Sequence, residues 1–339
     1  MIRIVGDCNF ADGYFDIGFG VGSLLKSGKD PFACLYREDA DFWIGNFECV
    51  ASSSTNKDGI DGQYFRIEPE LLSHFRHLDL YGVANNHVMQ HGELAYNDLL
   101  DFIESVGSQY VGSINKKSHH FHHQGKTIGV VAFSQRPDHF SRTPSYWSLP
   151  EYTDIQREID SLEDCDYRIA FIHWGNEFIN RPYIDQKQFA HLLVDRGVDL
   201  IIGMHPHILQ GYEVYNGKHI FYSLGNFVFR MAWEPTHYSI IVSVDFSTDI
   251  PHVSYNYAEI DPISGFPHEV ESVPEQYTLP LLSKRIYECC ENELYYSEVF
   301  QHMNEYRKAN RIRFIKDLSR LSIKDSTQMI KSFIQRRLK

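Results

Sequence analysis

The sequence predicts an α/β layered fold, and three features of the chain lead to this prediction. Short segments rich in β-branched and aromatic residues alternate with segments of helical periodicity, a pattern typical of layered α/β proteins. Each strand-like segment ends in Gly or Asn followed by polar residues. The chain has 339 residues, of which 43% are hydrophobic and 14% aromatic, so it is long enough to bury a large core.

Six segments share the strand-like pattern, and each leads into a polar cluster. In chain order they are residues 2–5 before Gly6-Asp7-Cys8-Asn9, 42–44 before Gly45-Asn46-Phe47-Glu48, 78–83 before Ala84-Asn85-Asn86-His87, 167–172 before His173-Trp174-Gly175-Asn176-Glu177, 198–202 before Gly203-Met204-His205-Pro206-His207, and 220–224 before Gly225-Asn226-Phe227. Helix-like periodicity occurs at residues 69–75, 94–105, 153–162 and 185–196. Ligands of such folds collect at the carboxyl ends of the strands. We therefore expect the six clusters to form one shared site.

Two other motifs could suggest a binding site, but a purely structural interpretation is favoured for each. The segment 119–131 contains four histidines and predicts a hairpin that turns at Gln124-Gly125. Because alternate residues of a strand face opposite sides, the four histidines are divided between two faces, and a polar hairpin arm is favoured over a metal site. The glycines at 18, 20 and 22 follow no convincing strand and do not match GxGxxG, so a plain loop is favoured over a phosphate-binding loop.

The strand-like patterns stop near Thr278, so the sequence predicts a main domain at residues 1–278 and a helical, basic extension at residues 279–339. The whole chain has a net charge of −13, whereas residues 303–339 contain eleven Lys or Arg and three Asp or Glu. Such an acidic chain is not expected to bind nucleic acid. The basic extension is either a docking surface for a membrane or protein partner or a helical segment packed on the main domain. The oligomeric state stays open.

The cellular setting follows from simple absences in the sequence. We expect the six cysteines to be reduced thiols, since they show neither CxxC spacing nor a regular framework. The chain starts directly with a strand-like segment, without the pattern of a signal peptide. No apolar run reaches membrane-spanning length. These features favour a cytoplasmic protein, with peripheral membrane attachment as an option.

The polar clusters contain carboxylate, amide and imidazole groups, a mixture that suits Mn, Fe or Zn better than calcium. A carboxylate from the second cluster could bridge two such ions, which lie about 3.5–4 Å apart in hydrolytic sites. Divalent ions polarise a phosphoryl group and supply hydroxide near neutral pH. A histidine outside the coordination sphere can protonate the leaving oxygen.

Taken together and in this order, the six clusters resemble those of the poly-γ-glutamate capsule-synthesis family (CapA type), a branch of the calcineurin-like metallophosphoesterases. Tyr64-Phe65-Arg66 before Pro69-Glu70 is also similar to that family. The resemblance covers roughly residues 1–260 and implies a four-layer α-β-β-α sandwich. It also implies the metal ligands, which are Asp7, Asn9 and His207 for a first ion, Glu48 as a bridge, and Asn86, His173 and His205 for a second.

The same resemblance implies the catalytic and substrate-binding residues. Asp7 and His87 are the expected catalytic residues, with His87 as the general acid. We expect Arg66, Glu177 and Asn226 to contact the substrate. Three positions depart from the usual pattern: Asn9 replaces a histidine of the superfamily, Glu48 replaces an aspartate, and Gln90 replaces an aspartate of the capsule-synthesis branch.

The expected function is therefore a metal-dependent, phosphoesterase-like hydrolase with one or two divalent ions (Mn, Fe or Zn). Its substrate would be a phosphorylated or anionic intermediate in the synthesis of a capsule or exopolymer, either poly-γ-glutamate or polysaccharide. One alternative is a non-hydrolytic assembly or scaffold protein with a degenerate metal site. In that case, deleting the chain after Thr278 should leave the metal content unchanged. A second alternative is an amide-bond hydrolase or ligase-like activity on poly-γ-glutamate.

Overall fold

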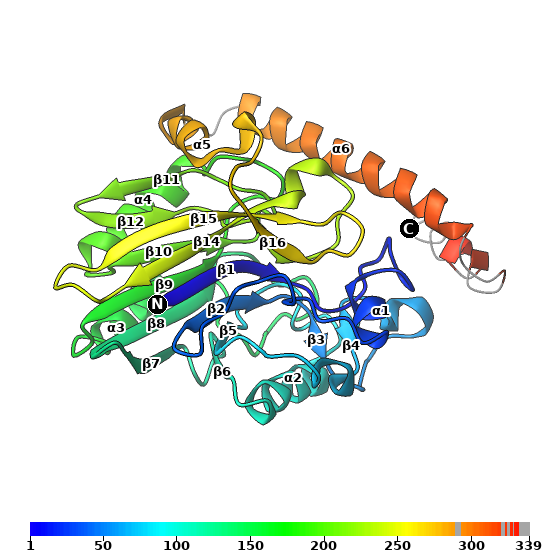
Figure 1. The fold of residues 1–339 in the computed structure, drawn as a ribbon, viewed down its shortest axis with the longest axis horizontal. Helices are drawn as coiled ribbons and strands as arrows, with labels where there is room; N and C mark the ends of the chain where they lie inside the picture. The colour runs from blue at the N-terminus through cyan, green and yellow to red at the C-terminus, as the bar shows by residue number, and fades with distance from the viewer. Residues whose placement is uncertain (289–292, 320–322, 324–325, 328, 332–339) are drawn as a thin grey trace.

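Two β-sheets packed face to face form the centre of the protein in this computed structural model (Figure 1). The structure describes the whole chain except residues 289–292, 320–322, 324–325, 328 and 332–339. The first sheet has the strand order β16-β15-β14-β1-β2-β5-β6, with β13 also paired to β1, and the second has the order β11-β12-β10-β9-β8-β7.

The strands of the first sheet are β1 (Ile2–Cys8), β2 (Phe42–Phe47), β5 (Leu80–Gly82), β6 (Gln109–Val111), β13 (Asn226–Val228), β14 (Tyr238–Asp245), β15 (His252–Ile260) and β16 (Pro267–Val270). Those of the second are β7 (Ser118–His123), β8 (Lys126–Ser134), β9 (Tyr167–His173), β10 (Leu200–Met204), β11 (Tyr212–Tyr215) and β12 (Lys218–Phe221). A short separate pair is formed by β3 (Val50–Ala51) and β4 (Arg66–Ile67).

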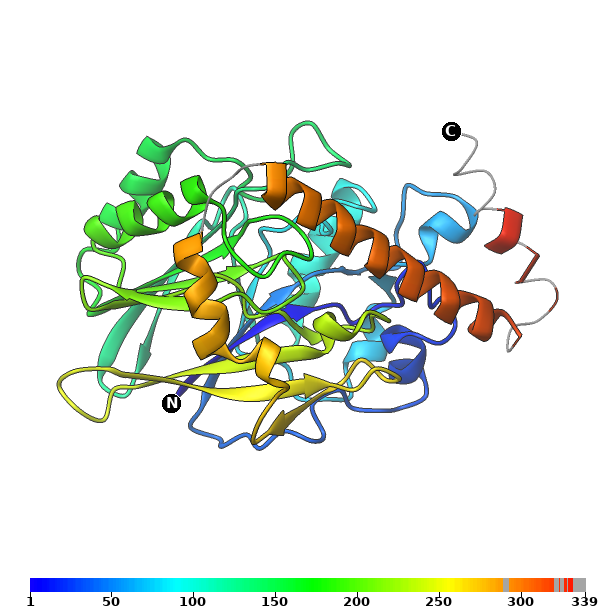
Figure 2. The same cartoon turned by 90° about the horizontal axis from the view of Figure 1, so that it is seen from above.

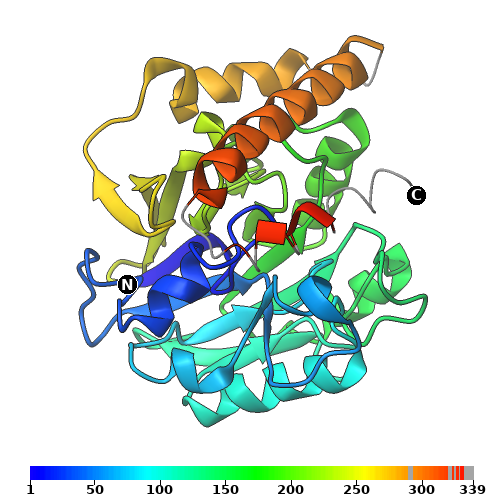
Figure 3. The same ribbon diagram turned by 90° about the vertical axis from the view of Figure 1, so that its right-hand side faces the viewer.

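Helices cover the outer faces of both sheets and complete four layers, as predicted. Side chains of α1 (Val21–Lys26) and α2 (Glu93–Ser105) share a core with the outer face of the first sheet. Side chains of α3 (Tyr152–Asp160) and α4 (Ile184–Asp195) do the same for the second sheet. A third core fills the space between the sheets, where Ile4 and Ile44 of the first sheet meet residues such as Val130 of the second. Figure 3 shows α2 on the side of the molecule opposite α5 and α6.

Most of the predicted elements are present, with a few corrections. The hairpin at Gln124-Gly125 is formed by β7 and β8, and His120 and His122 face solvent, as strand alternation predicts. The predicted helix at 69–75 is only a 3₁₀ turn, Pro69–Leu72. The glycine segment predicted as a plain loop contains turns and then the start of α1. The strands β14, β15 and β16 belong to no predicted segment.

The segment after Thr278 is helical, as predicted, in the part that the structure describes. It forms α5 (Leu279–Arg285) and the long helix α6 (Glu293–Leu318). No helix of the described residues is long and apolar enough to cross a membrane. In Figure 2, α6 runs diagonally across the near side of the molecule, from the green segments toward the blue N-terminal ones. Helix α6 packs along the main domain, which is one of the two alternatives given for the extension.

Close backbone approaches hold the ends of the central strands of the second sheet together. The Trp174 Nε1–H donates a hydrogen bond of 2.9 Å to the Tyr222 carbonyl, directly over Gly203. A Cβ atom on Gly203 would lie 2.1 Å from that carbonyl oxygen and 2.2 Å from Trp174 Nε1. Only glycine therefore fits here, two residues before His205.

We expect Gly203→Ala to lower the free energy of unfolding by about 3 kcal/mol or more, because the added methyl group must displace backbone. Urea unfolding monitored by circular dichroism measures the change. Gly217→Ala is the control: its Cβ meets open space, so only the positive φ of +76° carries a cost, about 1 kcal/mol. Equal losses for the two variants would contradict the packing argument.

Candidate metal centre

The carboxyl ends of β1, β2, β9 and β10 bring the predicted site residues together. The register of the first sheet places Asp7 beside Asn46 of β2 on one side and Asn226 of β13 on the other. In the second sheet, Met204 is paired with His173, so the His-Pro-His turn starts next to that histidine. Asp7, Glu48, His173, His205 and His207 are all buried.

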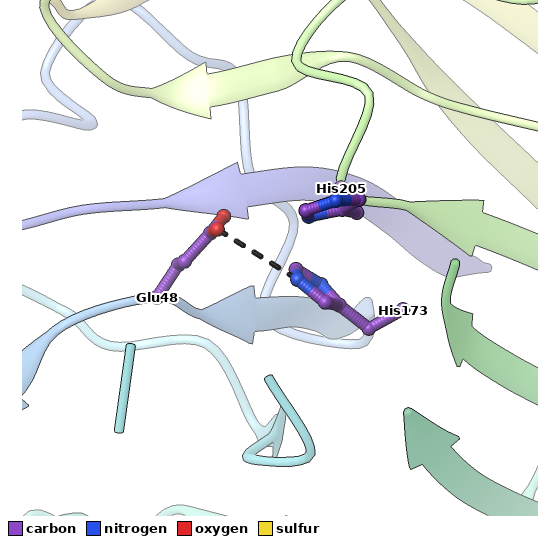
Figure 4. A group of neighbouring side chains, drawn as sticks. All are labelled: Glu48, His173 and His205. Atoms are coloured by element: carbon purple, nitrogen blue, oxygen red, sulfur yellow. Dashed lines mark ion pairs between the residues drawn. The ribbon is translucent and has the colours of Figure 1, made fainter. Parts of the chain in front are cut away.

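Two groups of three side chains are close enough to hold a cation each. The first group contains Asp7, Glu48 and His207, and the second contains Glu48, His173 and His205. Within each group, one ligand atom per residue lies within 4.8 Å of the others. Glu48 belongs to both groups, and the sequence predicts this residue as the carboxylate that bridges two ions. Figure 4 shows the Glu48 carboxylate pointing toward the His173 ring, with the His205 ring beside it.

The backbone of the His-Pro-His turn is strained. His205 and His207 have φ values of +97° and +59°, a region that non-glycine residues seldom adopt. Two hydrogen bonds hold the turn in this conformation: the His205 N–H donates to Asp7 Oδ2 (3.2 Å), and the Phe178 N–H donates to the Pro206 carbonyl (2.9 Å). Strain of this kind is typical of functional sites, where the surrounding structure maintains it. Here it directs two histidines toward the carboxylates.

Burial is the largest influence on the pKa values of the two carboxyl groups, Asp7 and Glu48. Burial raises the pKa of Asp7 to about 6, although a hydrogen bond of 2.8 Å from Asn46 Nδ2 opposes the increase. Burial, and then the charge of Asp7, raise the pKa of Glu48 well above its ordinary value. Among the described residues, no group donates a hydrogen bond to either oxygen of Glu48. Two buried carboxylates at this distance repel each other.

Burial also keeps the histidines neutral. It lowers the pKa of His207 to about 3 and the pKa values of His173 and His205 well below the ordinary value. Neither ring nitrogen of His205, nor Nδ1 of His173, has a hydrogen-bonding partner among the described residues. Neutral imidazoles with unpaired nitrogens, set beside buried carboxylates, are the donor set of Mn, Fe or Zn. The residues therefore fit a divalent cation.

Asn226 fixes the orientation of His207. Its Nδ2–H donates to the Thr236 carbonyl (3.3 Å), so its Oδ1 accepts from His207 Nδ1, 3.0 Å away. This hydrogen bond leaves the Nε2 lone pair of His207 free to face Glu48 at 3.9 Å. Asn226 is a predicted substrate contact, but both ends of its carboxamide are engaged within the protein.

His87 lies at the edge of the two groups, with its Nε2 3.9 Å from Glu48 Oε1. Its Nδ1 is 3.0 Å from Gln90 Oε1, and the ring of Phe65 stacks on it at a centroid distance of 4.0 Å. Burial lowers the pKa of His87 to about 4. Sequence reasoning missed Phe65, although this residue stands directly before Arg66 in the segment noted for its resemblance.

The remaining predicted residues lie in several surroundings. Asn86 Oδ1 is 2.8 Å from His173 Nε2, beside the second group. Asn9 uses its Oδ1 to accept the Ala11 N–H (3.0 Å). The Arg66 guanidinium donates to the carbonyls of Ser52 and Gly62 and to Glu68, which ties β4 to its surroundings. Its Nε and Nη1 donors are therefore occupied away from the ligand groups.

One basic residue that sequence reasoning missed lies close to the site. Arg136 follows β8. Burial lowers the pKa values of His173 and His205, and the positive charge of Arg136 adds to this decrease. Burial raises the pKa of Glu177, and the same charge opposes that increase. Arg136 Nη1 is 3.4 Å from Asn176 Oδ1. Gln135 N donates to the His173 carbonyl (2.9 Å), which anchors this loop to β9. In the sequence, only the position of Arg136 after an apolar strand could have indicated its role. The polar residues around it lack the Gly or Asn that begins the six predicted clusters.

We expect His205→Ala to remove more metal than His207→Ala. His205 belongs to the group of Glu48 and His173, which has Asn86 beside it, so the ion bound there has more candidate ligands and should be the more tightly held. Either substitution should weaken binding by at least the roughly 10–100-fold typical of residues that only support a ligand. Plasma mass spectrometry of purified protein and Mn²⁺ titration of stripped protein measure the losses.

The matched control is His122→Ala, which removes an exposed histidine from the β7–β8 hairpin and should leave the metal content unchanged. Glu48→Gln should weaken both ions, because Glu48 belongs to both groups. Equal losses for His205→Ala and His207→Ala would mean that this division of the ligands is wrong.

Comparison with known proteins identifies the family. The model of the family "Bacterial capsule synthesis protein PGA_cap" matches residues 3–231. The chain is 31% identical over 216 residues to "PGA biosynthesis protein CapA" of Bacillus subtilis, a match that covers 60% of this chain and 57% of that protein. It is 27% identical over 233 residues to "Capsule biosynthesis protein CapA" of Bacillus anthracis, covering 61% and 55%. The matches thus span little more than half of these relatives.

Among solved structures, a 5′-nucleotidase from Candida albicans aligns with 92% of this chain and 58% of its own length, at 13% identity and a TM-score of 0.43. The family assignment rests on the sequence matches, which include every predicted ligand from Asp7 to His207 within residues 3–231. The chain belongs to the bacterial capsule synthesis protein family PGA_cap.

Proposed function

We propose that the protein is a metal-dependent phosphoesterase that acts on a phosphorylated, anionic intermediate of capsule or exopolymer synthesis. The observation that carries the proposal is the pair of buried three-residue groups that share Glu48. The printed names of the two Bacillus relatives, which refer to PGA and capsule biosynthesis, support the choice of substrate class.

Asp7, Glu48 and His207 would hold one ion, and Glu48, His173, His205 and Asn86 the other. When bound, such ions supply Lewis-acid polarisation of a phosphoryl group and a nucleophile at neutral pH. The strained turn keeps His205 and His207 aimed at the carboxylates before any substrate arrives. The site is therefore preorganised, and little reorganisation accompanies the reaction.

Two cationic or proton-bearing groups beside the ligands suit an anionic ester. Arg136 lies on the side of His173, His205 and Glu177, where its guanidinium can bind a phosphate oxygen. His87 is the proposed proton donor to the leaving oxygen. Its pKa of about 4 keeps it neutral in the free protein, but the negative charge of a bound phosphate ester would raise that pKa toward neutrality.

The test is hydrolysis of an aryl phosphate ester by the Mn²⁺-loaded protein. We expect His87→Ala to lower kcat by about 10²–10⁴-fold while metal content stays unchanged, as for loss of a general acid. Arg136→Ala should raise KM more than it lowers kcat. A metal-loaded wild-type protein that hydrolyses no ester in a broad phosphate screen would contradict the proposal.

Gln90 provides a second test of the role of His87. Replacing this buried amide by the isosteric carboxylate in Gln90→Glu places a negative charge on the atom that faces His87 Nδ1. The charged form of His87 is then favoured, so its pKa should rise above about 4. An NMR titration of the His87 ring protons measures the rise, and the alkaline limb of the kcat profile should move to higher pH. A profile unchanged by a measured rise in pKa would exclude His87 as the proton donor.

A non-hydrolytic assembly role is a second candidate, and one observation favours it. The outer side of α6 carries exposed apolar residues, including Phe300, Ile312 and Ile315, among the basic residues Lys308 and Arg311. This surface is a candidate contact for a protein partner or a membrane. Amide-bond chemistry on poly-γ-glutamate would use the same ligand groups. The substrate screen separates these functions when it includes γ-glutamyl peptides beside phosphate esters.

A further inference from the structure

Helix α6 makes polar contacts with two loops that directly follow strands of the site. The first loop, residues 174–183, continues from His173 at the end of β9, and the second, residues 229–237, continues from β13, which carries Asn226. Because the helix is largely polar, it depends on such contacts for its position. An α-helix of this length extends about 39 Å, enough to bridge both loops.

The contacts to the first loop are distributed along the N-terminal half of α6. Asn176 Nδ2 donates to the Tyr295 hydroxyl (3.1 Å), and Arg181 forms an ion pair with Glu298. His302 Nδ1 donates to the Phe178 carbonyl (2.7 Å), and the Tyr306 ring stacks on the Phe178 ring at a centroid distance of 4.1 Å. Phe178 is therefore held by α6 at both its backbone and its side chain.

Phe178 in turn contacts the His-Pro-His turn. Its backbone N–H donates to the Pro206 carbonyl, and its ring centroid lies 5.9 Å from that of His207. Phe178 itself has a φ of +62°, a conformation that needs support from its surroundings. Phe229, from the second loop, contacts the same His207 ring at 5.1 Å. The His207 ring thus lies between two aromatic residues and the Asn226 carboxamide.

The second loop is held by the C-terminal half of the helix. Arg313 Nη1 donates to the Met231 carbonyl (3.0 Å), and Arg230 Nη2 lies 3.3 Å from Asp317 Oδ2. Both loops therefore share one support. They are far apart in the sequence, since Phe178 lies 50 positions before residue 228, which ends β13 and directly precedes the second loop.

We infer that α6 supports the metal centre, and that Tyr306 positions His207 for metal binding through Phe178. Tyr306 is a positioning residue, because it touches Phe178 rather than the ligand groups. The inference deepens the proposed function and rests on its metal centre. It also reverses an expectation of the assembly hypothesis: truncation after Thr278 should change the metal content, because it removes the support of the first ligand group.

The test compares Tyr306→Ala with Tyr306→Phe in the full-length protein. Loss of the ring should weaken Mn²⁺ binding at the Asp7–Glu48–His207 group by about 10-fold, the lower end of the range for residues that orient ligands. Tyr306→Phe retains the stack and should bind as the wild type does. Phe300→Ala, on the exposed side of the same helix, is the control. Calorimetric titration of stripped protein resolves the two binding steps.

A metal-independent measurement keeps this inference distinct from the proposed function. In ¹⁵N-histidine-labelled, metal-free protein, the Nδ1–H of His207 should give a hydrogen-bonded resonance, assigned by its absence in His207→Ala. We expect Tyr306→Ala to shift or broaden this resonance and Tyr306→Phe to restore it. An unchanged resonance, or unchanged Mn²⁺ affinity in Tyr306→Ala, would overturn the inference. A wild-type protein that binds no metal would refute the proposed function, and the resonance would still decide the role of Tyr306.

Discussion

The proximity of two buried carboxyl groups, Asp7 and Glu48, constrains the rest of the site. Removing a carboxylate from water costs several kcal/mol, and a second one nearby adds repulsion. The surrounding side chains are neutral amides and imidazoles, so they offset only part of this cost. A bound cation would offset the remainder, and metal binding would then be linked to the stability of the folded state. The close glycine contacts and the strained His-Pro-His turn all serve to keep this pair and its histidines in place.

The site residues could be predicted because the ends of strands can be recognised in a single sequence. The short apolar runs before Asp7, Glu48, His173 and His205 predict strands, and a parallel arrangement brings their ends together. Sequence reasoning failed where a residue acts through a neighbour. Phe65 has no chemical signature of its own, since its role depends on its contact with His87.

The extension after Thr278 shows a second limit of sequence patterns. Its composition leaves a docking surface and a packed helical segment as alternatives, and the helical spacing of Phe314 and Ile315 predicts that both lie on one apolar face. In the structure Phe314 is buried, whereas Ile315 is 67% exposed. The sequence also predicts a second apolar face made by Ile330, Phe333, Ile334 and Leu338, of which only Ile330 lies within the described residues. The helix is positioned by ion pairs and aromatic stacking with distant loops, and such long-range partners leave no periodic trace in the sequence.

The position of β1 in the first sheet has a consequence for folding. This strand is paired on one side with β2 and on the other with β13 and β14, which follow more than 200 residues later in the chain. Until those strands are synthesised, one edge of the apolar β1 has no partner and is open to wrong pairing. Contacts so far apart in sequence form slowly. The candidate metal centre, in which Asp7 of β1 lies beside Asn226 of β13, is therefore a late product of folding.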